Sequence, residues 1–287
     1  MILLSEILKI AEHKGVPPST IDKDWVLGHL LAEIARQAWG QDNLLFKGGT
    51  CLKKCYFPGY RFSEDLDFTI VNDSFLLKER MIMEVLNAVT QSSGILFAPF
   101  NISKILFRDR HLGYQVLLRF WGGHHRRDQI PPAEYNRWHT AIKIEMTWYE
   151  LICFPVAPMK LNDGYSDSVM LSDVTLPCYT LSEIIAEKLR ATIQRSYPAP
   201  RDYYDLWFLI KEVDHDNWPA IVDAFRRKAE YKHVSFSNHL DFFEPGRLSR
   251  SERAWKQSLG GHLSIEQLPE FNHIIDYLKV TLQEIFQ

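Results

Sequence analysis

The sequence has few cysteines, no excess of basic residues and no long apolar run. Its four cysteines, at positions 51, 55, 153 and 178, form no CxxC pair, which excludes a small disulfide-stapled secreted domain. The net charge of −3 argues against a chain that binds nucleic acid over its whole surface. No stretch approaches the about 20 apolar residues of a membrane helix. We therefore expect a cytoplasmic protein with reduced thiols and no membrane partner.

Other common signatures are missing as well. The first residues lack a basic segment followed by a long apolar run, so we expect no signal peptide. The chain contains no P-loop, no recognisable Ser-His-Asp arrangement and no internal repeat. Cys51 and Cys55 lie four residues apart on one expected helix, and no His or Cys pair follows nearby. Two buried thiols are therefore favoured there over a zinc site.

The chain of 287 residues is 46% hydrophobic and 24% charged, as in globular proteins. Its pattern predicts an α/β region with N-terminal helices over residues 1–175 and a helical region over 176–287. Strands are expected at 44–47, 65–70, 102–107, 113–120 and 140–147. Helices are expected at 3–14, 22–39, 75–92, 180–196, 202–213, 217–231 and 264–286.

Asp65 and Asp67 form the most informative pair in the sequence. On an expected strand, residues at i and i+2 share one face, so both carboxylates point the same way while Leu66 and Phe68 face the core. Two neighbouring carboxylates repel each other unless a cation lies between them, and Mg²⁺ takes such oxygen ligands together with substrate phosphates. An Asp-X-Asp at a solvated strand edge is also common, so the pair alone does not decide the function.

A glycine turn precedes these aspartates. Gly48 and Gly49 lie where an expected strand leads into a helix, so backbone amides can approach an anion. Thr50 can cap that helix or donate to a phosphate oxygen. Arg61 and Ser63, after an expected helix of about a dozen residues, can orient the aspartates or a triphosphate.

The order Gly-Gly-Thr, helix, Arg-X-Ser-X-Asp-X-Asp resembles the first motif of the polymerase-β-like nucleotidyltransferases. Its form, Lys-Gly-Gly-Thr followed by Arg-Phe-Ser-Glu-Asp-Leu-Asp-Phe, is similar to that of the AbiEii-type toxins of type IV toxin–antitoxin systems. The resemblance implies an α+β fold, with a mixed sheet, flanking helices and a helical C-terminal region. It also implies Mg²⁺, with Mn²⁺ as the alternative, and a third carboxylate on a later strand.

Glu145 is the candidate for that third carboxylate. In the alternating segment 140–147 it shares a face with Lys143, opposite Ile142 and Ile144. A surface ion pair explains the same pattern equally well.

Two further motifs lie in the helical region. Lys188 falls on or beside an apolar stripe, where it needs a carboxylate or phosphate partner or must extend past the core edge. Asp202 leans toward the core side of the next helix, or stabilises its N-terminus. Glu-Lys-Leu-Arg-Ala and Arg-Asp-X-Tyr-Asp-Leu also occur in AbiEii-type toxins. That resemblance implies that Lys188 contacts nucleotide phosphates and that Asp202 is essential.

The function expected from the resemblance is transfer of a nucleoside monophosphate from an NTP to RNA, foremost the tRNA 3′ end, which blocks translation. A cognate antitoxin is the expected protein partner. Transfer to a protein hydroxyl and a non-catalytic binding role remain alternatives. Residues 220–257 carry eight Lys and Arg against five Asp and Glu, so they can form an RNA-binding patch or a solvated helix face. The candidates are Arg226, Arg227, Lys228, Lys232, Arg247, Arg250 and Arg253.

Overall fold

The computed structural model describes residues 2–125, 128–168, 171 and 173–287. Arg126 and Arg127 lie outside the described residues. The chain forms two compact units. Unit 1 comprises Met1–Tyr149 and Val156–Cys178, and unit 2 comprises Glu150–Pro155 and Tyr179–Gln287.

Unit 1 contains a mixed sheet of eight strands. The strands are β1 (Leu44–Lys47), β2 (Asp65–Ile70), β3 (Leu96–Phe97), β4 (Ile102–Phe107), β5 (Arg110–Trp121), β6 (Ala141–Thr147), β7 (Ala157–Lys160) and β8 (Thr175–Cys178). Their order is β3-β5-β6-β2-β1-β8-β7, with β4 paired to β5. β2 runs parallel to β6 and antiparallel to β1, and β1 runs parallel to β8. The predicted mixed sheet is therefore confirmed.

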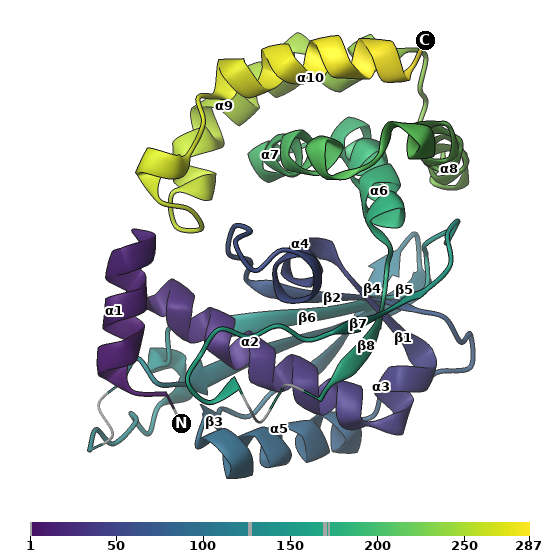
Figure 1. Ribbon diagram of the computed structural model, residues 1–287. Helices are drawn as coiled ribbons and strands as arrows, with labels where there is room; N and C mark the ends of the chain where they lie inside the picture. Colours follow the sequence, from purple (N-terminus) through teal and green to yellow (C-terminus); the bar gives the residue numbers. More distant parts are fainter. Residues whose placement is uncertain (1, 126–127, 169–170, 172) are drawn as a thin grey trace. The chain divides into compact units, whose positions relative to one another are not determined.

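Helices cover this sheet and supply the core of unit 1. They are α1 (Leu4–Lys14), α2 (Pro18–Arg36), α3 (Ala38–Asn43), α4 (Gly48–Cys51) with the π-helical turn η1 (Leu52–Tyr56), α5 (Glu79–Ser93) and the 3-10 turn η2 (Tyr135–Arg137). Helices α2 and α5 lie along one side of the strands and α4 on the other (Figure 1). The long helix α2 begins at Pro18, whose fixed φ suits a first helical turn. α1 ends at Gly15 in the left-handed conformation, with φ 62°.

Unit 2 is helical in the part of the chain that the structure describes. It contains α6 (Leu181–Gln194), α7 (Pro200–Leu209), α8 (Trp218–Tyr231), α9 (Pro245–Leu259) and α10 (Phe271–Ile285), with the short turns η4 (Ile210–Glu212), η5 (His215–Asn217), η6 (His239–Phe243) and η7 (Ile265–Gln267). α6 begins after Thr180, whose hydroxyl accepts the Glu183 amide hydrogen at 3.2 Å. A cluster of aromatic rings from Phe225, Phe236, Phe242 and Phe286 forms part of its core.

Several boundaries differ from the sequence expectations. The helix expected from residue 264 begins only at Phe271, two residues after Pro269, because a proline disfavours helical geometry in the residue before it. The helix after the Gly-Gly turn ends at Tyr56 and is shorter than the expected dozen residues, since Pro58 and Gly59 follow. α3, α9 and the short strands β3, β7 and β8 had no sequence prediction. Among the described residues, no helix is both long and apolar enough to span a membrane.

Candidate active site

Three carboxylates share one face of the central strands of unit 1. In β2, Asp65 and Asp67 are partly exposed while the residues between and after them are buried. The parallel pairing of β2 with β6 places Asp67 beside Glu145 and Asp65 beside Lys143. Because both strands alternate with the same phase, all four polar side chains lie on the same side of the sheet. The sequence period predicted each strand's face, and the register brings the two faces together.

Negative charge exceeds positive charge on this face. The Lys143 ammonium Nζ lies 3.3 Å from Glu145 Oε2 and 3.9 Å from Asp65 Oδ2. Burial raises the pKa of Asp67 to about 6 against the opposing effect of Lys47, and Glu145 and Asp65 raise it further. Burial also raises the pKa of Asp65, while Lys143 opposes that shift. The carboxylates are thus held together at an electrostatic cost that a bound cation would remove.

The glycine turn approaches these carboxylates closely. Gly48 has φ +80°, and a Cβ added there would lie 2.5 Å from Asp67 Oδ2. A Cβ on Gly49 would lie 2.9 Å from Ser63 Oγ and 3.2 Å from an Arg61 guanidinium nitrogen. A side chain at either position would therefore collide with the predicted site. The glycines, Asp67, Ser63 and Arg61 form one compact constellation in unit 1.

Thr50 and Arg61 stabilise this arrangement through the backbone. The Thr50 hydroxyl donates to the Asp65 carbonyl oxygen at 2.6 Å and makes no helix cap, so the predicted capping role is wrong. The reason is that α4 already begins at Gly48, with Lys47 at its N-cap, so Thr50 lies inside the helix. Arg61 is buried and donates to the Phe62 carbonyl at 3.1 Å. Thr50 thus fixes the turn against the start of β2, and Arg61 stabilises the segment that precedes β2.

The carboxylate face fits a hard divalent cation by its chemistry. Asp65, Asp67 and Glu145 supply oxygen ligands only, from one side of the sheet, and such ligands suit Mg²⁺ or Mn²⁺. Across the described residues, the one group of three His, Cys, Asp or Glu side chains with ligand atoms within 4.8 Å of one another is formed by cysteines. The three carboxylates therefore stand wider apart than that, with Lys143 serving as counter-ion to two of them.

Lys188 and Asp202 belong to a second charged cluster, within unit 2. The Lys188 ammonium Nζ lies 2.5 Å from Asp205 Oδ2 and 3.3 Å from Asp202 Oδ1. Arg195 contacts the other oxygen of Asp202 at 2.7 Å. Asp205 is fully buried and Asp202 nearly so, at 0% and 4% side-chain exposure. The structure thus supplies the carboxylate partner that the position of Lys188 required.

Sequence reasoning overlooked Lys47 and Arg195. Lys47 precedes Gly48, pairs in register with Asp67 across β1 and β2, and opposes the rise in the pKa of Asp67. Its position next to the Gly-Gly turn was the available signal. Arg195 is the C-cap residue of α6, seven positions after Lys188. That spacing, about two helical turns, was the available signal that the two cations lie on the same side.

The seven basic residues proposed for RNA divide into two groups. Lys228 is buried and pairs with Glu183 and the Leu151 carbonyl. Lys232 pairs with Glu150 at 3.3 Å, and Arg247 donates to the Asp241 and Ile193 carbonyls. Lys228 is therefore wrong as an RNA contact because its side chain is buried, and Lys232 and Arg247 are engaged in contacts within unit 2. The exposed members are Arg226, Arg227, Arg250 and Arg253.

Comparisons with known proteins agree with this architecture. MenT4, a nucleotidyltransferase toxin from Mycobacterium tuberculosis H37Rv, has a similar structure with a TM-score of 0.65 and 18% sequence identity, over 100% of this chain and 89% of that one. At this identity the similarity supports the fold. No curated protein matches the chain. The model of the family described as nucleotidyl transferase AbiEii toxin, type IV TA system, matches residues 29–277. The match covers most of the sequence, and the chain therefore belongs to the AbiEii family of nucleotidyltransferase toxins.

Proposed function

We propose that this toxin transfers a nucleoside monophosphate from an NTP to the 3′ end of tRNA and thereby blocks translation. The observation that carries the proposal is the carboxylate face of β2 and β6, with Asp67 beside Glu145 and the Gly48–Gly49 turn packed against Asp67. In the reaction, an acceptor hydroxyl oxygen bonds to the α-phosphorus and the bond from that phosphorus to the bridging oxygen breaks. Pyrophosphate leaves, and the hydroxyl proton passes to a carboxylate or to solvent.

Asp65, Asp67 and Glu145 are the proposed ligands of Mg²⁺, with Mn²⁺ as the alternative. The ion, when bound, neutralises the charge that develops on the phosphate oxygens. The glycines let the backbone approach the triphosphate, and Ser63 lies beside Gly49 as a hydroxyl donor. Thr50 holds the turn against β2, and Arg61 stabilises the segment before β2. These residues catalyse the reaction by positioning and charge complementarity, which suffice for phosphoryl transfer.

The cluster in unit 2 is proposed to present a lysine to phosphate. Lys188 has 13% side-chain exposure and is oriented by Asp202 and Asp205. Lys188 is thus proposed to contact the nucleotide phosphates, and Asp202 is proposed to hold it in place. Asp202 acts as a positioning residue here because its oxygens already bind Lys188 and Arg195.

RNA binding is proposed to use the four exposed arginines of α8 and α9. Neutralising each phosphate releases counter-ions, so affinity for tRNA should fall steeply as salt rises. Replacing Arg226 and Arg227 by alanine should lower the slope of log affinity against log salt by about 1 for each phosphate that is no longer neutralised. Replacing Glu230, an exposed acidic residue on α8, is the matched control and should not lower the slope. An unchanged slope in the arginine variant would remove this patch from the proposal.

The decisive experiment incubates the protein with total tRNA, Mg²⁺ and each of the four labelled NTPs. An Asp65→Ala/Asp67→Ala variant with an unchanged circular dichroism spectrum serves as control. Label in tRNA that is absent with the variant supports the proposal and identifies the nucleotide. Label in protein instead would move the acceptor to a protein hydroxyl. Normal toxicity of the variant in cells would indicate a toxin that acts by binding alone.

The type IV family also implies a cognate antitoxin. Co-expression with the neighbouring gene product, with growth as the readout, tests that partner. Rescue of growth in cells expressing the toxin supports it, and unrelieved toxicity counts against that gene product.

A further inference from the structure

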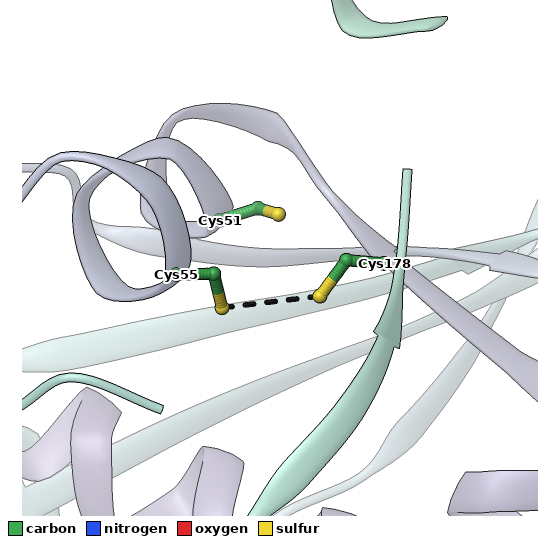
Figure 2. Close-up of side chains that lie close together, drawn as sticks. All are labelled: Cys51, Cys55 and Cys178. Atoms are coloured by element: carbon green, nitrogen blue, oxygen red, sulfur yellow. Dashed lines mark hydrogen bonds between the residues drawn. The ribbon is translucent and has the colours of Figure 1, made fainter. Parts of the chain in front are cut away.

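Three cysteines distant in sequence meet in the interior of unit 1. Cys51 ends α4, Cys55 lies in η1, and Cys178 is the last residue of β8 (Figure 2). Their exposed fractions are 0%, 3% and 0%. The parallel pairing of β1 with β8, at Phe46 and Cys178, brings the third thiol to the helix that carries the other two. The sequence predicted two buried thiols and could not place the third.

The sulfur positions match a shared ligand. The three Sγ atoms all lie within 4.8 Å of one another, and the Cys178 thiol donates to Cys55 Sγ at 3.8 Å (Figure 2). Metal–sulfur bonds of about 2.3 Å place three sulfurs around one ion about 4 Å apart. The cluster therefore needs little contraction to hold an ion. A disulfide requires sulfurs at about 2.05 Å, and all four cysteines of the chain are free thiols.

The chemistry and burial of the three sulfurs favour a soft ion. Thiolates select soft cations such as Cu⁺ and Zn²⁺. No His, Asp or Glu among the described residues joins the three cysteines, and the sulfurs are closed to solvent. Structural zinc takes four ligands, so three dry sulfurs favour Cu⁺.

We propose that Cys51, Cys55 and Cys178 form a buried three-sulfur site for one thiophilic d¹⁰ cation, with Cu⁺ preferred over Zn²⁺. The ion would tie α4 and η1 to β8. Cys51 directly follows Thr50, whose hydroxyl donates to the Asp65 carbonyl. The sulfur site and the glycine turn therefore share the short helix α4. The proposal concerns metal binding alone and does not depend on the acceptor of the transferase.

The test measures metal content in protein made with metal present, because the covered sulfurs exchange slowly with solvent ions. The full chain is expressed in medium with added copper or added zinc and purified without oxygen or chelators. We expect about one copper per chain, an X-ray absorption spectrum with three sulfur neighbours, and a higher melting temperature than that of the metal-free protein. Zinc should be retained more weakly in the parallel culture.

Cysteine variants distinguish metal binding at this site from metal binding to a cysteine elsewhere in the chain. Cys153 belongs to unit 2 and lies outside the cluster, so Cys153→Ser should keep the copper. Cys51→Ser, Cys55→Ser and Cys178→Ser should each bind it at least about 10-fold more weakly. Circular dichroism identifies any variant that fails to fold, and Cys→Ala at the same position then replaces it.

Two results would overturn the metal site itself, and a third would overturn its preference for copper. One is wild-type protein without stoichiometric metal after both cultures. The other is copper retained equally by the folded Cys51 and Cys55 variants. Tighter retention of zinc than of copper, with a fourth light-atom neighbour, would overturn the three-coordinate assignment.

Discussion

The charged groups of the two units differ in how their charges are balanced. In unit 1, Asp65, Asp67 and Glu145 share a half-exposed sheet face with two lysines, Lys143 and Lys47, as nearby counter-ions. In unit 2, Lys188 and Arg195 face Asp202 and Asp205, two cations against two carboxylates. A balanced buried cluster is complete without a ligand, whereas an unbalanced face gains most from a cation. The difference in charge balance supports the proposed metal site in unit 1 and the proposed positioning role of Asp202 in unit 2.

The largest expected effect follows from removing a negative charge from the unbalanced face, which is the sheet face that carries Asp65, Asp67 and Glu145. Asp67→Asn should lower kcat by about 10³-fold or more, because the change removes a proposed metal ligand from the transition state. Single-turnover transfer to tRNA measures the loss. The melting temperature without metal should not fall, since burial already disfavours the Asp67 carboxylate. A kcat of the variant within a few-fold of the wild-type value would contradict the proposal that this face binds the metal.

A single methyl group at the turn should have the next largest effect. Gly48→Ala places a Cβ 2.5 Å from Asp67 Oδ2 on a backbone with φ +80°, so the turn must move. A displacement near 1 Å costs about 100-fold in rate. Gly59→Ala is the matched control, because a Cβ at Gly59 meets nothing within 4 Å. Equal activity of the two variants would show that the close approach is unimportant.

In the balanced cluster, the expected loss is in stability. Asp205→Asn should lower the free energy of unfolding by about 3 kcal/mol, because it leaves the buried Lys188 ammonium with one carboxylate fewer. Denaturant unfolding measures this value. The paired change Lys188→Met/Asp205→Leu should recover most of the stability while lowering nucleotide affinity. Full activity of the folded double variant would exclude Lys188 from phosphate binding.

The smallest expected effect is a pH dependence confined to the unbalanced face. The pKa of Asp67 is raised from 3.8 to about 6 in the folded chain. The folded chain therefore holds this proton more tightly than the unfolded chain does. The stabilisation from the protonated carboxyl is fully present below the unfolded pKa and is lost as the pH rises through 6. Asp67→Asn should therefore be more stable than wild type at neutral pH, and the difference should vanish near pH 4. Melting curves without metal test this, with Asp205→Asn for comparison. A difference independent of pH would contradict the raised pKa.

Parts of this comparison could be predicted from the sequence. The two-residue period of β2 and β6 fixed which side chains share a face, since alternation is a local property. The pairing of Asp67 with Glu145 required the sheet order, which follows from contacts far apart in the chain. Likewise, Lys188 visibly needed a partner, but only folding supplied Asp205. The short strand β8 has too few residues for a recognisable period, so Cys178 could not be placed.

The C-terminal helices were harder to predict for another reason. α9 begins with Pro245 and Gly246 and is rich in exposed polar residues, which weakens the apolar pattern of a helix. Its start depends on the Glu244 carboxylate, which accepts the Gly246 and Arg247 amide hydrogens. The expected helix at 264–286 had the right apolar face, and Pro269 delayed its first turn.

The segment Glu150–Pro155 determines which fragments of the gene can express the helical unit on its own. Glu183 accepts the amide hydrogens of Cys153 and Phe154, and Lys228 contacts the Leu151 carbonyl. An expression fragment that starts at Tyr179 would leave Glu183 without its two amide donors and Lys228 without its carbonyl acceptor. Such a fragment should aggregate, whereas one carrying residues 150–155 on a short flexible linker should remain in solution. The helical unit is therefore encoded by two separated stretches of the gene, and any chimaera between family members should exchange both together.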